Sequence, residues 1–294
     1  MTSDRIRIAL QKSGRMAEDS QKLLADCGLH VERSSDQLFC RIKELPIDVL
    51  LVRDDDIPNF VSNGICDLGI VGENVFAESN ATPNKLSAKI LERLGFSQCR
   101  LSLAVPESGE IQSISDLAGK TIATSYPNML KDYLAQNGVT AQTLVMTGSV
   151  EVAPRLKIAD AICDIVASGA TLAANNLREM TVVLRSEALL IRSAHKLPQD
   201  KEDIIHRLRL RMRGALQASD SKYIMLHANK DDLAAITKLI PGAESPTILP
   251  LQGQNDKVAV HAVCRETVFW ETMENLRAAG ASAILVLPIE KMMG

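Results

Sequence analysis

The chain has 294 residues, of which 46% are hydrophobic and 23% charged, values typical of an ordinary soluble globular protein long enough for two or three domains. Its formal net charge of −3 excludes a global basic field that would attract nucleic acid, so local donors must hold any anionic ligand. The charged amino terminus lacks a signal-peptide core, and no apolar run approaches the roughly 18 residues of a membrane helix. We therefore expect a cytoplasmic protein without membrane or nucleic-acid partners.

The cysteine and histidine patterns argue against a disulfide framework and against a structural zinc site. The six cysteines are scattered without a CxxC pair, and the five histidines share no metal-ligand spacing. Several cysteines lie within apolar runs, which predicts reduced thiols in the core.

Strands and helices alternate through the first two-thirds of the chain, which predicts parallel sheets covered by helices. The predicted strands lie at 5–10, 48–53, 66–72, 101–106, 120–125, 140–146, 160–168 and 179–193. The predicted helices lie at 15–28, 59–64, after 72, at 128–138, 155–160 and 170–179.

An internal echo divides this region into two halves. Residues 65–72 read ICDLGIVG and residues 162–169 read ICDIVASG, each after an acid-x-x-Pro element that begins at Asp55 or Glu151. Chance similarity is the alternative, because ICD followed by apolar residues is a common match. If the echo is real, it predicts two α/β lobes with a cleft, and both echoed loops lie at strand carboxyl ends that face the cleft.

The last third of the chain follows a different pattern. An amphipathic, basic helix at 199–219 precedes a βαββαβ order, which is the ferredoxin-like arrangement. Its elements are predicted at 223–227, 231–240, 245–251, 257–264, 266–280 and 281–288. We expect a separate domain over 222–294 with a sensing or assembly role. The first lobe then comprises 1–104 and 184–221, the second 105–183, and the chain crosses between them near 103–106 and 184–192.

The stretch DAICDIVASGAT at 160–171 combines carboxylates with a small, hydroxylated loop. Phosphate is bound by backbone N–H groups at a helix N-terminus and by hydroxyls, which the segment from Ser168 to Thr171 offers. Ribose hydroxyls donate to carboxylates, which Asp160 and Asp164 offer. A ribose 5-phosphate unit fits both, although Asp160 as a turn cap and Ser168 as a helix cap remain an alternative.

Several segments resemble the ATP phosphoribosyltransferase family. The most specific is GSVEVAPRLKIADAICDIVASGATL, and shorter matches are KSGR at 12–15, VRDDDIP at 52–58, NGICDLGIVGENV at 63–75 and ESPTILPL at 244–251. The C-terminal domain makes the chain similar to the long form of the family. The resemblance implies a two-lobed body of the periplasmic-binding-protein type. It also implies transfer of the phosphoribosyl group of phosphoribosyl pyrophosphate to N1 of the ATP adenine, with Mg²⁺ assistance and histidine inhibition.

The resemblance also implies roles for residues of the second lobe. Asp160 and Asp164 would hold the ribose, and the 5-phosphate would lie on Ser168, Gly169, Ala170 and Thr171. Glu151 is assigned to the sugar or the metal, with a helix-start acid as the alternative. No protein ligand of Mg²⁺ is assigned.

ATP is expected on the first lobe. Lys12, Arg15, Arg53 and Tyr126 lie at or after the ends of predicted strands, and Arg100 follows a possible loop, GFSQC, near the crossover. The remaining candidates, Asp67, Leu68 and Gly69, belong to the first repeated loop. Each has a structural alternative. For example, Arg15 fits a solvated helix residue, Arg53 a salt-bridge partner of the acidic run beside it, and Asp67 a turn former.

The C-terminal domain offers Ser245, Thr247 and Ser282 as candidate contacts of histidine, with turn and cap roles as an equal alternative. We expect a homo-oligomer between dimer and hexamer. Two other functions are considered: a two-lobed ligand receptor without catalysis, and an RNA-binding C-terminal module. The scarcity of aromatic residues on its predicted strands argues against RNA binding.

Overall fold

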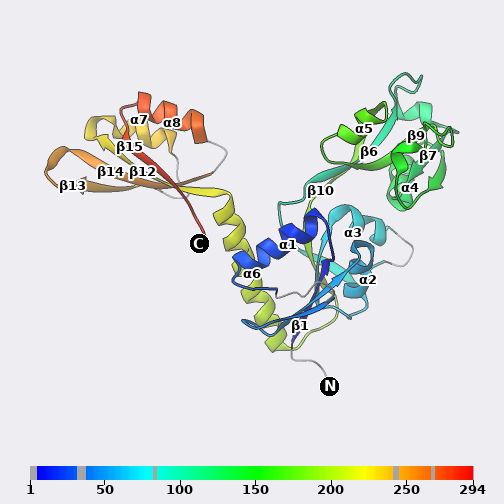
Figure 1. Cartoon of the computed structure of the whole chain (residues 1–294), viewed down its shortest axis with the longest axis horizontal. Coiled ribbons are helices and arrows are strands. Elements are labelled where there is room, and N and C mark those ends of the chain that lie inside the picture. The colour runs from blue at the N-terminus through cyan, green and yellow to red at the C-terminus, as the bar shows by residue number, and fades with distance from the viewer. Residues whose placement is uncertain (1–4, 32–37, 82–84, 241–244, 266–268, 294) are drawn as a thin grey trace. The chain divides into compact units, whose positions relative to one another are not determined.

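The computed structural model describes residues 5–31, 38–81, 85–240, 245–265 and 269–293 (Figure 1). Residue contacts divide the chain into two units, and each is described by itself. The first comprises Met1–Ala25 and Leu29–Ile205, and the second comprises Asp26–Gly28 and His206–Gly294. The predicted class, a two-lobed α/β body followed by a ferredoxin-like βαββαβ domain, is confirmed.

The first lobe of the first unit is built on a six-stranded sheet with the order β2-β3-β1-β4-β11-β5. Strand β1 pairs in parallel with β3 and β4, whereas β2, β11 and β5 run antiparallel to their neighbours. Its strands are β1 (Ile6–Gln11), β2 (Phe39–Ile42), β3 (Ile47–Val52), β4 (Leu68–Gly72), β5 (Ala88–Arg93) and β11 (Ala188–Ser193). Its helices are α1 (Arg15–Asp26), η1 (Asp54–Asp56), α2 (Ile57–Ser62) and α3 (Glu73–Asn80).

The second lobe is built on a five-stranded sheet with the order β10-β6-β9-β7-β8. Strands β7, β8 and β9 are parallel, and β6 and β10 run antiparallel to their partners. The strands are β6 (Cys99–Pro106), β7 (Thr121–Thr124), β8 (Gln142–Val145), β9 (Ala161–Val166) and β10 (Leu177–Ser186). The helices are η2 (Ile114–Leu117), α4 (Pro127–Gln136), η3 (Val150–Val152) and α5 (Ala170–Ala174).

Two crossovers connect the sheets, at residues 94–98 and at Glu187. The first crossover precedes the predicted position near 103–106, because β6 already pairs with β10 from Cys99 onward. Residues 99–104 and 184–186 therefore belong to the second sheet. The prediction of parallel sheets is correct only in part, because β2, β6 and β11 run against the parallel strands of their sheets.

Two local helix predictions are also wrong, and two strands are missed. The segment 155–160 forms turns rather than a helix, and the helix predicted over 170–179 ends at Ala174 because β10 begins at Leu177. The edge strands β2 and β5 are not predicted at all. The matching aspartates of the internal repeat also differ in position: Asp67 precedes β4, whereas Asp164 lies within β9.

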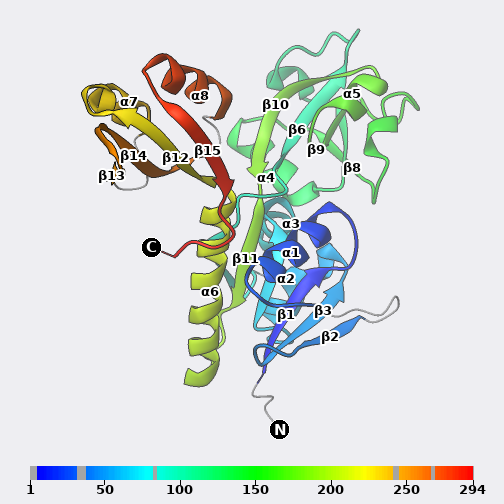
Figure 2. The ribbon, with the colours of Figure 1, turned by 60° about the vertical axis from the view of Figure 1, so that its left-hand side comes forward.

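The second unit contains α6 (Gln199–Ser219) from His206 onward and the βαββαβ domain, whose sheet has the order β13-β14-β12-β15. All its pairings are antiparallel, and α7 and α8 lie on one face of it (Figure 2). The bounds are β12 (Ser221–Asn229), η4 (Lys230–Asp232), α7 (Leu233–Leu239), β13 (Thr247–Leu251), β14 (Gln254–Arg265), α8 (Phe269–Ala278) and β15 (Ser282–Pro288). The predicted helix start at 266–268 lies outside the described residues.

Cysteine placement agrees with the expectation of reduced thiols. All six are free, and Cys27, Cys40, Cys66 and Cys163 are buried. Within the described ranges, no helix combines the length and apolar character needed to cross a membrane.

Candidate active site

The carboxyl edges of the two parallel strand sets meet between the lobes. Strand β4 leads into α3 and β7 leads into Tyr126, and Asn74 Nδ2 in α3 donates to Tyr126 Oη at 2.7 Å. Burial raises the pKa of the Tyr126 hydroxyl, and the charges of Asp164 and Asp54 act in the same direction. Asp54 follows β3 in the first lobe and Asp164 lies on β9 in the second, so acidic groups from both lobes act on one hydroxyl. Open α/β sheets bind ligands at such edges.

Three cationic residues lie near the carboxyl edge of the first lobe's sheet. Lys12 follows β1 and its backbone N–H donates to the Val52 carbonyl at 2.8 Å, while Arg53 follows β3. Arg15 begins α1 with 79% of its side chain exposed, and its Nε lies 4.0 Å from Asp19. A positive φ of 91° at Gly14 shapes the turn between them. All three cationic side chains belong to exposed residues at the strand ends, which suits an anionic ligand.

Asp67, Leu68 and Gly69 do not lie at this edge. Asp67 precedes β4, so it occupies the opposite, amino edge, where its carboxylate accepts from Arg7 N at 2.8 Å and Lys201 Nζ at 3.1 Å. Leu68 is fully buried. A Cβ on Gly69 would lie 2.7 Å from Ile57 Cγ2 and 2.9 Å from Val61 Cγ2. The prediction that these three residues face the cleft is therefore wrong, because Asp67 precedes β4 and Leu68 and Gly69 begin it, so they lie at the amino end of the strand.

Asp160 lies at the opposite end of strand β9 from the loop that follows the strand. Asp160 precedes the strand, and its Oδ2 accepts from Thr121 N at 2.8 Å. The loop at 167–171 follows the strand, and six extended residues span about 20 Å. Asp160 therefore cannot share a ribose 5-phosphate unit with Ser168, which contradicts the predicted proximity.

Asp164 lies within β9 on the side of the loop. Burial raises the pKa of its carboxyl, a hydrogen bond from Ile165 N at 2.8 Å opposes this, and the charge of Glu151 in η3 raises it further. The charge of Glu151 therefore acts on Asp164, and both residues lie nearer to the carboxyl edge than Asp160 does. The sequence motif contains one carboxylate suited to the site and one that joins neighbouring strands.

The loop after β9 has the expected features of an anion cradle. Ser168, Ala170 and Thr171 are exposed, and Gly169 has a φ of 86° that favours glycine. Ser168 Oγ accepts from Ala170 N at 3.4 Å, and α5 begins at Ala170. Two hydroxyls and the first N–H groups of α5 are thus gathered in five residues.

Arg100 supports this loop from the neighbouring strand β6. Its Nη1 donates to the Ala167 carbonyl at 3.0 Å, and its Nε and Nη2 donate to Glu179 at 2.5 and 2.6 Å. The guanidinium lowers the pKa of Glu179, which also accepts from Ser102 Oγ. Arg100 therefore positions the start of the loop, a role that differs from the predicted contact with ATP.

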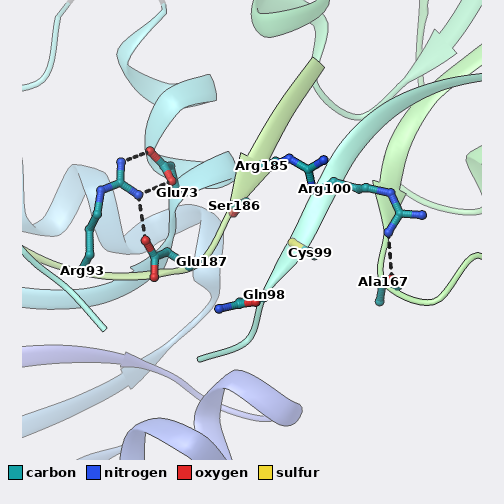
Figure 3. Close-up of a pocket in the computed structure, with 9 residues that line it drawn as sticks. All are labelled: Glu73, Arg93, Gln98, Cys99, Arg100, Ala167, Arg185, Ser186 and Glu187. Carbon is teal, nitrogen blue, oxygen red and sulfur yellow. Dashed lines mark hydrogen bonds and ion pairs between the residues drawn. The ribbon is translucent and has the colours of Figure 1, made fainter. Parts of the chain in front are cut away.

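A pocket of about 490 Å³ lies beside Arg100 at the crossovers (Figure 3). Its lining comprises Glu73, Arg93, Gln98, Cys99, Arg100, Ala167, Arg185, Ser186 and Glu187. Arg185 pairs with Arg100 across β10 and β6. Apart from Arg100, none of these residues was predicted from the sequence. Their position close to the two crossovers is the feature that could have indicated them.

The candidate histidine contacts do not gather within one chain. Thr247 is on the edge strand β13 and Ser282 on the opposite edge strand β15, where its Oγ donates to the His227 carbonyl at 3.4 Å. Three strand spacings, about 14 Å, separate these edges. Ser245 precedes β13 and is exposed. A single histidine cannot bridge Thr247 and Ser282 of the same sheet.

The described part of the chain contains no group of three or more His, Cys, Asp or Glu side chains suited to hold a metal ion. A dedicated protein cage for a metal is therefore not found there. Mg²⁺ commonly takes one or two carboxylates together with substrate phosphates and waters, and the pair Glu151 and Asp164 fits that pattern.

The family models and a curated relative agree on one family. The family model described as ATP phosphoribosyltransferase matches residues 53–214, and the model of its C-terminal domain matches residues 218–291. An ATP phosphoribosyltransferase of Maricaulis maris is 54% identical over 294 residues, which is 100% of both chains.

Among solved structures, the ATP phosphoribosyl transferase (HisG:HisZ) complex from Thermotoga maritima has a TM-score of 0.60 and 26% identity, over 71% of this chain and 98% of that chain. A periplasmic sulfonate-binding protein of Methylobacillus flagellatus has a TM-score of 0.49 and 15% identity, over 72% of this chain and 68% of that chain.

Proposed function

The chain belongs to the ATP phosphoribosyltransferase family, in its long form, and we propose that its two lobes divide the substrates of this enzyme between them. The enzyme catalyses the first step of histidine biosynthesis, and the alternative of a receptor without catalysis is set aside. Phosphoribosyl pyrophosphate binds the second lobe at the loop 167–171, and ATP binds the first lobe at Lys12, Arg15 and Arg53. The main support for this division of the substrates is that the carboxyl edges of the two sheets meet at Tyr126.

In the second lobe, the hydroxyls of Ser168 and Thr171 and the first N–H groups of α5 donate to the 5-phosphate. The Asp164 carboxylate accepts from ribose hydroxyls. Two residues of β9, Ile165 and Val166, separate it from the loop. Glu151 lies on the same side and is the second carboxylate available to the sugar or to a metal. Asp160, on the opposite edge, supports the fold by joining β9 to β7.

In the reaction, adenine N1 attacks C1 of the sugar with its ring lone pair, so the attack itself needs no general base. The bond between C1 and the pyrophosphate oxygen breaks, and the transition state has oxocarbenium character, as at other anomeric centres. The protein's own contribution is to hold two anionic substrates in line, with the cations of the first lobe on one side and the loop on the other. Tyr126, whose neutral hydroxyl faces both lobes, borders the reacting atoms.

Mg²⁺ is the metal that the donor set fits best. When bound, it neutralises charge on the departing pyrophosphate. Glu151 and Asp164 would supply the few protein contacts that such an ion requires.

The C-terminal domain is the regulatory part of this proposal, with histidine as the inhibitor and a homo-oligomer as the working state. Its sheet carries α7 and α8 on one face only. On the other side Leu285 and Leu287 are 50% and 51% exposed, an apolar surface suited to another copy of the chain. Because Thr247 and Ser282 lie on opposite edges, a histidine pocket that uses both is assembled from two copies.

Pyrophosphate release tests the proposed function. The purified protein should release pyrophosphate when ATP, phosphoribosyl pyrophosphate and Mg²⁺ are all present, and not when either substrate is omitted. Histidine should reduce the rate. Release that does not depend on ATP, or no release with all three present, would contradict the proposal.

A further inference from the structure

Helix α3 of the first lobe supplies a cap to helix α4 of the second. Glu78 Oε1 accepts from Asn128 N at 2.9 Å and from Asn128 Nδ2 at 2.7 Å, and Glu78 Oε2 accepts from Met129 N at 2.8 Å. The residue at the cap position of α4 itself, Tyr126, makes no side-chain cap bond. The first N–H groups of a helix lack partners within it and favour a negative charge. Glu78 fills this role from the other lobe.

The amino end of α3 is fixed at the crossovers. Arg93 donates to both carboxylate oxygens of Glu73 at 2.5 and 2.7 Å and to Glu187 at 2.9 Å (Figure 3). Asn74 N donates to Ser186 Oγ at 3.0 Å, and Ser186 Oγ donates to Asn74 Oδ1 at 2.9 Å. Helix α3 is therefore tied to the segment where the chain passes from one sheet to the other.

Two attachment points on one rigid helix resist rotation between the lobes. Glu73 and Glu78 are five residues apart, which corresponds to about 7.5 Å along a helix. Between them, Asn74 Nδ2 donates to Tyr126 Oη, so the residue that precedes α4 is held by the same helix. A rotation about the crossovers would break the bonds of Glu78 first, because they lie furthest from the crossovers.

We propose that Glu78 is a positioning residue that fixes the angle between the lobes and, through it, the alignment of the two substrates. This inference rests on the proposed division of ATP and phosphoribosyl pyrophosphate between the lobes. Each substrate still binds its own lobe when Glu78 is removed, but the reacting atoms are held in line for less of the time. A misplacement of about 1 Å can cost up to about a hundredfold in rate.

The test compares Glu78→Ala, Glu78→Gln and the wild type in the full-length chain. We expect Glu78→Ala to lower kcat about tenfold or more while the equilibrium Kd of phosphoribosyl pyrophosphate changes less than about twofold. Glu78→Gln retains one acceptor oxygen and should recover part of kcat. Amide exchange of a peptide that covers 126–131 should be faster in Glu78→Ala, and this readout does not depend on activity. If Glu78→Ala fails to fold, Glu78→Gln provides the same comparison.

Asp132→Asn is the matched control, because it removes an exposed carboxylate from the same helix α4. It should leave kcat and exchange at 126–131 unchanged. Wild-type kcat in Glu78→Ala, a rise in Kd that parallels the fall in kcat, or unchanged exchange at 126–131 would each overturn the proposal. A wild-type protein that releases no pyrophosphate would instead contradict the proposed function, while the exchange result would still report the cap.

Discussion

At the scale of single residues, Asp164 combines a functional position with a cost to the fold. Its carboxyl is half-buried, and burial raises its pKa with help from Glu151. An acid whose pKa is higher in the folded state binds more protons there than in the unfolded state. Stability therefore falls as the pH rises from the ordinary Asp pKa, near about 3.9, through the raised value. The site retains a carboxylate that folding alone would not favour.

We predict that Asp164→Asn removes this pH-dependent loss. The difference in Tm between the variant and the wild type should be more positive at pH 7 than at pH 4, because protonated Asp164 resembles an amide at low pH. Thermal melts of both proteins across this range measure it, and other titrating groups cancel in the difference. A Tm difference that is the same at both pH values, or that is more positive at pH 4, would show that burial does not raise the pKa of this carboxyl.

Thr171 tests the hydroxyl donors of the loop. Thr171→Val keeps the shape but removes the hydroxyl, and Thr171→Ser keeps the hydroxyl but removes the methyl. We expect the valine variant to lose about 1.5–3 kcal/mol of transition-state stabilisation, a tenfold to hundredfold fall in kcat/KM for phosphoribosyl pyrophosphate, and the serine variant to lose much less. Equal kcat/KM values for the two variants would indicate packing instead.

At the scale of elements, strand direction decides which motif residues can act together. The resemblance groups Asp160 with Asp164 because they are neighbours in sequence, but β9 separates Asp160 from the loop by its full length. Strand β4 likewise places Asp67 on the amino edge. Strand β5, AKILER, is missed because its side chains are largely exposed and charged, and its extended form comes from pairing with β11. The strands with buried apolar runs, such as β1 and β3, are predicted correctly because burial on both faces leaves a clear pattern.

Gly69→Ala tests the packing role that replaces the predicted ATP contact. The added Cβ would meet Ile57 and Val61 of α2, both fully buried, so we expect a loss of about 1–3 kcal/mol in the free energy of unfolding. The KM for ATP of the folded variant should change less than about twofold. Chemical denaturation and steady-state kinetics measure the two quantities.

A double-mutant cycle with Val61→Ala supplies the control for Gly69→Ala, since removal of the Val61 methyl groups relieves part of the clash. The double variant should lose less stability than the two single losses added. A KM that rises without any loss of stability would return Gly69 to the binding site.

At the scale of the whole molecule, the βαββαβ domain has a hydrophobic cluster of its own. The buried cluster of the C-terminal domain extends from Ile224 to Ala281 and includes no residue of the first unit. Three clusters of the two lobes lie entirely before residue 192. The βαββαβ order could be predicted from the sequence because each element is short and well marked. The histidine contacts could not, because hydroxyl residues at strand ends serve equally well as caps.

Truncation after Ser219 should therefore leave a folded protein that binds phosphoribosyl pyrophosphate but is insensitive to histidine. Inhibition requires that histidine bind one global state better than another, typically by about 1–3 kcal/mol, and the domain that provides this difference is removed. Calorimetry of substrate binding and inhibition assays check both parts. Full histidine inhibition of the truncated enzyme would rule out the regulatory role of the domain.

The central claim is that phosphoribosyl pyrophosphate lies at the carboxyl edge of β9, and a matched pair of variants tests it most directly. Asp164→Asn and Asp160→Asn make the same chemical change, one within β9 towards its carboxyl edge and the other just before its amino end. The measurement is kcat/KM for phosphoribosyl pyrophosphate at saturating ATP. The account predicts a fall of about tenfold to a hundredfold for Asp164→Asn and less than about threefold for Asp160→Asn, once the folded fraction is equal. A larger loss for Asp160→Asn than for Asp164→Asn would contradict it.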